Sequence, residues 1–263
     1  MSGRAVSPNP QRVVGRARRL GRTVAIIPAR GGSKGIPHKN VMDFCGEPLV
    51  VWSIRQALQS AAVGEVAVSS DDAGILAVAE RAGALPILRP AGISDDTASS
   101  ESALAHALSV LEQRGDEPVD LVVFIQATSP LRLAEQIDGA VALYLSGSWD
   151  CVFSAAEFED LCVWQRGEKE LKCLTYDPSA RRRRQESPPN LVENGSIYVL
   201  SAEFVRSGRE LLSGSCEAYS MPTWSIFEID EPSDIAVCET LMQRFVLGMT
   251  PGAVPEKRCG QDE

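Results

Sequence analysis

Two kinds of hydrophobic pattern alternate along the chain from Thr23 onward. Short apolar runs, typical of buried strands, alternate with longer segments whose apolar residues recur at helical spacing. The predicted strands are residues 24–27, 65–70, 85–88, 120–126, 150–155, 196–200 and 225–229. The predicted helices are residues 48–62, 73–82, 99–114, 133–145, 202–207 and 232–245. This order predicts an α/β fold, in which a doubly wound, mostly parallel sheet is covered by helices on both faces.

The alternation is interrupted between residues 157 and 192. Residues 163–165 and 171–174 have the pattern of two short strands around Gly167, and an arginine run and a Pro-Pro pair follow them. We interpret this segment as a small hairpin insertion in a single domain of residues 23–247, and we expect it to form the arm of a homodimer.

The two ends of the chain differ in charge. The first acidic residue is Asp43, and residues 1–22 form a basic arm that we predict to be disordered, as we do residues 248–263. The arm lacks the apolar core of a secretory signal, which favours a cytoplasmic location, although an Arg-rich arm also fits nuclear or organellar targeting. No apolar stretch approaches the length of a membrane span, so we expect no membrane partner.

Composition excludes several kinds of site. The seven cysteines are an odd number without a C-x-x-C pair, which indicates reduced thiols and not a disulfide framework or a zinc site. Two histidines are too few for a His-based metal cluster. The net charge of −9 argues against a nucleic-acid partner.

A glycine-rich, basic loop follows the first predicted strand. Gly31, Gly32 and Gly35 let backbone N–H groups approach phosphate oxygens, and the side chains of Arg30, Lys34 and Lys39 add positive charge. The order of these residues is neither that of a P-loop nor G-x-G-x-x-G. Loops of this composition are often only solvated turns, but the pattern also predicts a site for a nucleotide's phosphate tail.

An acidic pair follows the last predicted strand. If residues 225–229 form a strand, the alternation of side chains places Glu228 and Asp230 on the same side. Such a pair suits Mg²⁺, with Asp230 as the direct ligand and Glu228 acting through water. The alternative is that the acids of this segment complement the dipole of the following helix.

Five separate strings between residues 23 and 245 resemble those of the acylneuraminate cytidylyltransferases, the CMP-sialic acid synthetases. They are I-P-A-R-G-G-S-K-G-I-P with Lys39-Asn40, R-P with D-T-A-S-S, Q-A-T-S-P-L, R-Q with E-N-G-S-I-Y, and E-I-D. The last string departs from the family's D-x-D because Glu stands at position 228. The resemblance implies a Rossmann-like nucleotidyltransferase fold.

The resemblance also implies roles for individual residues. Nucleotide binding would involve Ala29, Arg30, Gly31, Gly32, Ser33, Lys39 and Asn40, with Arg89 and Ser100 facing the cytosine. Acceptor binding would involve Gln126, Thr128, Ser129, Arg184, Gln185 and Asn194. The groups acting in catalysis would be Arg30, Lys34, Lys39 and Asp230. D-D-T-A-S-S fits a helix cap equally well, and the arginine run that ends at Arg184 is ordinarily a solvated charge run.

The activity implied by this resemblance is transfer of CMP from CTP to the anomeric hydroxyl of a nine-carbon sugar acid. The products are a CMP-sugar and pyrophosphate, and Mg²⁺ is the expected cofactor. The acceptor would be N-acetylneuraminate or a related acid (Kdn, legionaminate, pseudaminate or Kdo), and the strings E-N-G-S-I-Y and R-R-R-Q favour a sialic-type acid over Kdo. A nucleotide-binding homologue without activity is the alternative from another class. No side chain in the sequence stands out as the general base.

Overall fold

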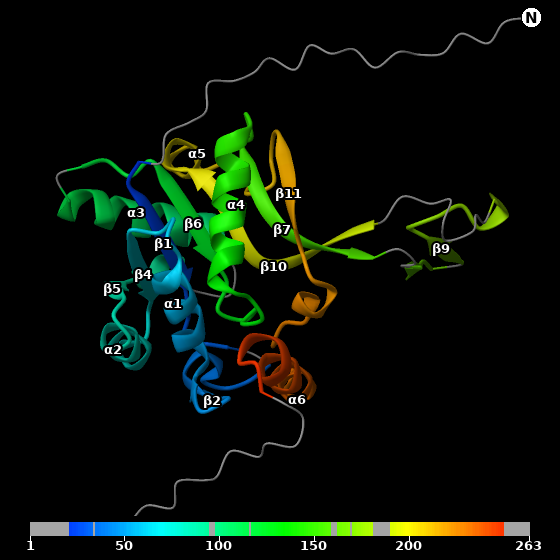
Figure 1. Ribbon diagram of the computed structural model, residues 1–263, viewed down its shortest axis with the longest axis horizontal. Helices are drawn as coiled ribbons and strands as arrows, with labels where there is room; N and C mark the ends of the chain where they lie inside the picture. The colour runs from blue at the N-terminus through cyan, green and yellow to red at the C-terminus, as the bar shows by residue number, and fades with distance from the viewer. Residues whose placement is uncertain are drawn as a thin grey trace, which may run out of the picture.

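A computed structural model of the chain describes residues 21–33, 35–94, 98–115, 117–158, 162–168, 170–180 and 190–249. Their centre is a seven-stranded sheet in the order β11-β7-β10-β6-β1-β4-β5 (Figure 1). Its strands are β1 (Thr23–Pro28), β4 (Glu65–Ser70), β5 (Leu85–Leu88), β6 (Leu121–Ile125), β7 (Cys151–Phe158), β10 (Asn190–Ser201) and β11 (Cys216–Met221). The helices are α1 (Leu49–Gln59), α2 (Ala73–Arg81), α3 (Ser100–Arg114), α4 (Ala134–Ser146), α5 (Ala202–Arg206) and α6 (Pro232–Leu241).

The sheet is mostly parallel, as the sequence predicts. Strands β5, β4, β1 and β6 pair in parallel, as do β7 and β11. Strand β10 is antiparallel to both of its neighbours, β6 and β7. The carboxyl ends of the parallel strands therefore lie at one edge of the sheet, where ligands bind in open α/β sheets.

Helices cover both faces of the sheet because its central strands are apolar on both sides. Along β1, Val24 and Ile26 pack in one cluster with Leu104 and Leu108 of α3. The alternate residues of β1 pack in a second cluster with buried side chains of α1, α2 and α4. The prediction of a doubly wound sheet is confirmed.

A third apolar cluster lies beyond the carboxyl edge of the sheet. Phe44 of the two-stranded β2–β3 ribbon (Asp43–Phe44 and Glu47–Pro48) packs with Ile229 and with Cys238 of α6. This cluster secures the chain around the acidic pair. Helix α6 continues into a π-helix over Met242–Val246, so the predicted last helix is present with an altered final turn.

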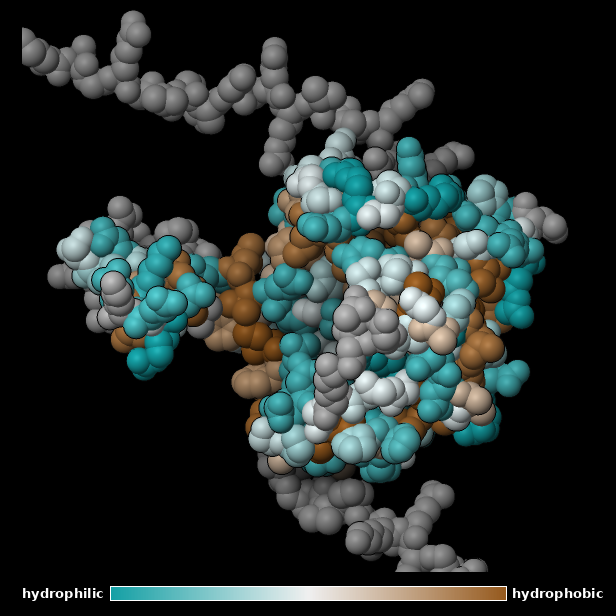
Figure 2. Space-filling view, turned by 180° about the vertical axis from the view of Figure 1, so that it is seen from behind, coloured by the Kyte–Doolittle hydropathy of each residue, from teal (hydrophilic) through white to brown (hydrophobic). Residues whose placement is uncertain are grey.

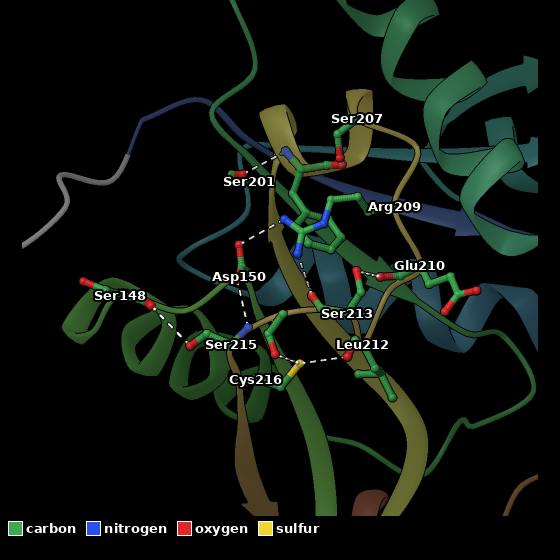
Figure 3. A network of polar contacts seen from close by, with 12 residues as sticks. Ser148, Asp150, Ser201, Ser207, Arg209, Glu210, Leu212, Ser213, Ser215 and Cys216 are labelled. Atoms are coloured by element: carbon green, nitrogen blue, oxygen red, sulfur yellow. Dashed lines mark hydrogen bonds and ion pairs between the residues drawn. The ribbon is translucent and has the colours of Figure 1, made fainter.

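A polar network joins the starts of β7 and β11, at the amino end of the sheet (Figure 3). Asp150 accepts a hydrogen bond from the backbone N–H of Ser215 at 2.8 Å, and it forms an ion pair with Arg209 at 3.4 Å. The Arg209 guanidinium also lies 4.6 Å from the ring centroid of Phe204, on α5. The network fixes the edge strand β11 and lies away from the carboxyl edge.

The predicted insertion forms an arm that stands away from the body (Figure 1). Its described part contains the hairpin β8 (Trp164–Arg166) and β9 (Leu171–Cys173), joined through Gly167 as predicted. The ends of β7 and β10 extend toward it, and Figure 2 shows hydrophobic surface where the arm meets the body. Exposed large apolar side chains of the arm are Val163, Trp164, Leu171, Leu174 and Leu191.

The predicted strand over residues 225–229 is wrong. Pro222 instead precedes a 3-10 helix of Thr223–Ile226, in which the Ser225 hydroxyl donates to the Pro222 carbonyl at 2.7 Å. The strand in this part of the chain is β11, whose mixed sequence C-E-A-Y-S-M reflects its place at the edge of the sheet. Strand β10 also begins at Asn190, six residues before the predicted start at Ser196, because its first part pairs with the extended end of β7.

Among the described residues, no helix is long and apolar enough to cross a membrane. The predictions for residues 1–20 and 250–263 concern segments outside the described part of the chain.

Candidate active site

A polar pocket of about 580 Å³ lies at the carboxyl edge of the sheet. It is lined by residues that follow β1, β5 and β6, by the start of α3, and by Asp230 and Glu231. The structure brings together these predicted site residues in the pocket wall: Arg30, Ser33, Lys39, Asn40, Arg89, Ser100, Gln126, Thr128 and Asp230.

The glycine-rich loop after β1, for which the sequence predicts phosphate binding, is called the phosphate loop below. It is held by contacts with the end of β4 and with Asn40. The backbone N–H of Gly31 donates to the Asp71 carboxylate at 2.9 Å, and that of Ala29 donates to the Ser69 carbonyl at 2.9 Å. Asn40 donates from its side-chain amide to the Arg30 carbonyl at 2.9 Å. Asn40 and the buried Ala29 therefore shape the loop through these contacts. Gly31 points its N–H at a carboxylate, a partner that the sequence analysis did not anticipate.

Gly35 is required where the loop crosses the acidic segment. A Cβ atom at this position would lie 2.2 Å from the backbone carbonyl oxygen of Asp230, far inside van der Waals contact. At Gly32, by contrast, no atom lies within 4 Å of such a Cβ. Only Gly35 of these two therefore allows a close approach of two backbones.

Lys39 links the loop region to the acidic segment. Its ammonium group donates to the Ile229 carbonyl at 2.8 Å and forms an ion pair with Asp230 at 2.9 Å. The Lys39 side chain is largely buried, whereas that of Asp230 is 61% exposed. A ligand anion at this position would meet an ammonium group that is already held in place.

Arg89 and the start of α3 form the opposite wall. The Arg89 guanidinium is buried and donates to the Ser69 hydroxyl at 3.2 Å and to the Ser69 carbonyl at 2.5 Å. Burial lowers the pKa of Arg89, the nearby Asp71 raises it, and Arg30 lowers it. Ser99 is the N-cap of α3 and accepts from the Ser102 N–H at 3.2 Å, so the capping interpretation of this string is correct. Ser100 lines the same pocket.

The loop after β6 forms the third wall. Gln126 and Thr128 line the pocket, whereas Ser129 is buried behind them. The Thr128 carbonyl accepts a hydrogen bond from the Ile229 N–H at 2.8 Å. Phe124 also faces the pocket and stacks on Tyr198, with ring centroids 5.1 Å apart. This apolar contribution was missed because Phe124 lies inside a buried strand, where an aromatic residue gives no signal of a site.

Asn194 is buried and forms part of an internal network. Its side-chain oxygen accepts from the Ser154 hydroxyl at 2.6 Å, and its amide donates to the Ser225 hydroxyl at 3.0 Å. The side chain thus ties β10 to β7 and to the 3-10 helix before the acidic pair. Its predicted contact with the acceptor stays a prediction.

The acidic pair lies on an irregular segment and not on a strand, so the alternation argument for it was wrong. Glu228 accepts from the Ser129 hydroxyl at 3.4 Å, and Asp230 pairs with Lys39. Desolvation and the charge of Asp230 raise the pKa of Glu228.

Helix capping is performed by a different acid. Asp234 accepts from the backbone N–H groups of Asp230 and Glu231 at 3.0 and 2.8 Å, and these hydrogen bonds lower its pKa. The side chains of Glu228 and Asp230 are therefore not the caps of α6. Among the described residues, no group of three or more His, Cys, Asp or Glu side chains could hold a metal ion.

Three predicted site residues, Lys34, Arg184 and Gln185, lie outside the described residues. Ala29, Gly31, Gly32, Ser129, Asn194 and Glu228 are described and are not part of the pocket lining. Asp71 was not predicted as a residue of the loop's surroundings, although its place directly after a strand is a signal that could have identified it.

The described residues define the chain as an α/β protein with a Rossmann-like sheet and a polar pocket at its carboxyl edge. Its backbone is similar to that of a CMP-2-keto-3-deoxy-manno-octonic acid synthetase complexed with CTP, with a TM-score of 0.63, 18% identity, and coverage of 85% of this chain and 99% of the other. The 4-diphosphocytidyl-2C-methyl-D-erythritol synthase of Anaerococcus prevotii gives a TM-score of 0.60 at 12% identity, over 84% of this chain and 96% of the other. These likenesses establish the fold.

Residues 24–244 match the sequence profile of the cytidylyltransferase family, and the chain belongs to this family. It is 36% identical over 227 residues to N-acylneuraminate cytidylyltransferase A of Danio rerio, and 30% identical over 223 residues to the N-acylneuraminate cytidylyltransferase of Escherichia coli. Each match covers 84% of this chain, and it covers 51% and 52% of the two relatives. Pseudaminic acid cytidylyltransferase of Campylobacter jejuni is 40% identical over 139 residues, which are 52% of this chain and 60% of the relative.

The resemblance to acylneuraminate cytidylyltransferases in the sequence is confirmed by these matches. The chain spans about half the length of the N-acylneuraminate relatives that it matches.

Proposed function

We propose that the chain transfers CMP from CTP to the anomeric hydroxyl of a sialic-type 2-keto sugar acid. The observation that carries this proposal is the pocket, in which Arg30, Lys39 and Arg89 surround the space beside Asp230 in a chain of the cytidylyltransferase family. Arg30 and Lys39 suit a triphosphate, the buried Arg89 suits the polar edge of a base, and the polar wall after β6 suits a hydroxyl-rich acceptor.

In the proposed reaction, the anomeric oxygen of the acceptor attacks the α-phosphorus of CTP. A new bond forms between this oxygen and the α-phosphorus, the bond from the α-phosphorus to the bridging oxygen breaks, and pyrophosphate leaves with that oxygen. The proton of the acceptor hydroxyl is released to solvent. Phosphoryl-type transfers of this kind depend on positioning and charge neutralisation more than on covalent chemistry of the protein.

Each wall of the pocket contributes one part of this arrangement. The loop from Ala29 to Ser33, together with Lys39, would hold the phosphates, and Arg89 with Ser100 would face the cytosine. Gln126 and Thr128 would orient the acceptor from the opposite side. Arg184 and Gln185 would contact the acceptor's carboxylate, for which a guanidinium fork is well suited.

The acidic pair fits Mg²⁺. This ion is typically bound by one or two carboxylates together with substrate phosphates and retained waters, and the described residues offer two carboxylates, of which Asp230 is exposed beside the pocket. Asp230 would be the direct ligand and Glu228 the second. When bound, Mg²⁺ would neutralise charge on the departing pyrophosphate.

Release of pyrophosphate tests the proposal. Each of the four nucleoside triphosphates is incubated with N-acetylneuraminate, with and without Mg²⁺, and pyrophosphate is measured. We expect release with CTP and Mg²⁺ and little with ATP, GTP or UTP. If CTP is bound but no acid in a panel of 2-keto sugar acids gives turnover, the chain is a non-catalytic homologue and the proposal fails.

A second acceptor is favoured by one specific observation. The similarity to pseudaminic acid cytidylyltransferase reaches 40% identity, although over half of the chain. We therefore include pseudaminate, legionaminate, Kdn and Kdo in the panel beside N-acetylneuraminate. The acid with the highest kcat/KM identifies the acceptor.

We further propose that the protein is a homodimer joined through the arm. The observation in support is that exposed apolar side chains such as Trp164 and Leu171 lie on a hairpin that stands away from the buried core. Burial of such surface against a second copy would stabilise the arm. Cytoplasmic location and the absence of a nucleic-acid partner remain predictions from the sequence.

A further inference from the structure

Arg132 is the largest fully buried side chain of the described residues, although it carries a charged group. It lies between the loop after β6 (residues 126–129) and the start of α4. Its guanidinium donates hydrogen bonds to three side chains and two backbone carbonyls. These partners are the Ser196 hydroxyl (2.8 Å), the Ser53 hydroxyl (3.1 Å), the Gln56 side-chain oxygen (3.2 Å), the Gln126 carbonyl (2.6 Å) and the Ser129 carbonyl (2.5 Å).

No carboxylate of the described residues forms an ion pair with Arg132. Burial lowers the pKa of its guanidinium to about 9, so the side chain remains a cation at neutral pH. A buried charge without a counter-ion costs stability, and a well-packed apolar side chain would avoid that cost. The cost indicates that the guanidinium serves a purpose other than stability.

The contacts of Arg132 define that purpose, because they join the pocket wall formed by the loop after β6 to the bulge of β10. One terminal nitrogen, Nη2, binds the Gln126 and Ser129 carbonyls and so fixes both ends of the loop after β6. The Nε atom binds Ser196, in the bulge of β10 where its pairing with β7 is irregular. A single rigid guanidinium therefore sets the separation of the loop and the bulge.

The surface that this separation controls is centred on Gly195, which has a φ of 63°. A Cβ atom at Gly195 would lie 3.2 Å from Gln126 Oε1, 3.3 Å from Ser129 Oγ and 3.4 Å from Glu228 Oε2. Three polar groups thus converge on one bare stretch of backbone. The loop in turn holds the acidic segment, through the Thr128 carbonyl with the Ile229 N–H and through Ser129 with Glu228.

We propose that Arg132 is a positioning residue for the transfer reaction. It sets the loop after β6, which would orient the acceptor, relative to the acidic pair, and it touches neither substrate. This inference rests on the proposed function. Asn40 donates to the Arg30 carbonyl and Arg89 donates to Ser69, and neither of these contacts involves Arg132. Loss of Arg132 should therefore impair use of the acceptor and of Mg²⁺ while CTP still binds.

The principal variant is Arg132→Lys, which keeps the positive charge but cannot bind two carbonyls and Ser196 with one planar group. We expect the acceptor KM to rise about tenfold or more and the Mg²⁺ concentration for half-maximal rate to rise severalfold, with the Kd for CTP within twofold of the parent by calorimetry. Ser196→Ala should change the same quantities in the same direction by a smaller factor.

Ser53→Ala is the matched control. It removes a hydrogen bond of the same type at Nη1, on the side away from the pocket, where Gln56 remains as a partner. All three quantities should stay within twofold of the parent. A purely structural role for Arg132 would instead make Ser53→Ala and Ser196→Ala equivalent.

Hydrogen exchange tests the positioning independently of turnover. In Arg132→Lys and Ser196→Ala, amides of residues 126–132 and 193–197 should exchange faster, whereas those of residues 29–33 should not. If Arg132→Lys does not fold, Ser196→Ala against Ser53→Ala carries the test. Unchanged exchange and an unchanged acceptor KM in the variants that fold would overturn the inference, as would an equal loss of CTP binding. A parent protein without turnover would overturn the proposed function, and the exchange data would still decide the role of Arg132.

Discussion

At the scale of single residues, Asp230 and Asp234 show how neighbouring carboxylates are divided between two tasks. Asp234 accepts two backbone hydrogen bonds at the start of α6, which is the ordinary role of an acid at a helix N-terminus. Asp230 makes an ion pair with Lys39 at the pocket instead. The helix-terminus interpretation of the acidic segment is therefore correct for Asp234, whereas the metal interpretation of Asp230 stays a prediction.

This division predicts that two amide substitutions affect different properties, turnover in one case and stability in the other. Asp230→Asn should abolish turnover at any practical Mg²⁺ concentration, because an amide is a poor ligand for a hard cation. Asp234→Asn should lower Tm through the weakened cap and leave the dependence of rate on Mg²⁺ unchanged. Initial rates across a Mg²⁺ series for both variants check this. A normal Mg²⁺ curve for Asp230→Asn would show that the metal site is wrong.

The contacts of some individual residues could not be predicted from the sequence. The polar residues after β1, β5 and β6 could be predicted to meet, because the carboxyl ends of parallel strands share one edge. Arg132 could not be found in this way, because arginine is normally exposed and its burial depends on the packing of α1, β10 and the loop together. The contact between Gly31 and Asp71 depends in the same way on the register of β1 against β4.

At the scale of secondary-structure elements, the central strands, the helices and the edge strand β5 were predictable, and the opposite edge strand β11 was not. Strands such as β6 are buried on both faces and are therefore continuously apolar. The edge strand β11 is partly exposed, so its pattern is mixed and it was missed. The apolar residues at 225–229 were mistaken for a strand, because burial of Ser225 and Ile229 between other elements gives a similar pattern.

The phosphate loop as an element makes a further prediction, for two of its glycines. Gly35→Ala should destabilise the protein by about 1–3 kcal/mol, the usual cost of forcing extra atoms into a packed site, because its Cβ meets the Asp230 backbone. Gly32→Ala faces open space and should change stability by less than about 0.5 kcal/mol. Urea unfolding of both variants provides the measurement. Equal stabilities would show that the loop shifts away from the acidic segment at no cost.

The arm makes a prediction of its own about assembly. Trp164→Glu places a charge on its apolar surface and should shift the protein from dimer to monomer in sedimentation velocity, with the fold retained by circular dichroism. Lys172→Glu on the same hairpin is the control and should leave the dimer intact, since charged residues at the rim of an interface contribute little. A parent protein that sediments as a monomer would exclude the proposed assembly.

At the scale of the whole molecule, the distribution of charge is the most informative property. The chain carries a net charge of −9, yet its pocket is lined by three cationic side chains. An acidic protein with a local cationic pocket repels nucleic acid in general but can still hold a small anion. Nucleotides should therefore stabilise the folded protein, and the gain in stability should depend on the base as well as on the phosphates.

Thermal unfolding measures this response. A ligand that binds the folded state alone, at about one hundred times its Kd, stabilises it by about 2.7 kcal/mol. For a protein of this size such a gain corresponds to a rise in Tm of roughly 5–10 °C. We expect this rise with CTP and Mg²⁺ and a smaller one with ATP or GTP at the same concentration, because Arg89 and Ser100 would contact the cytosine. If all the triphosphates and inorganic triphosphate raise Tm equally, the pocket recognises phosphate alone and the assignment of the wall at Arg89 is wrong.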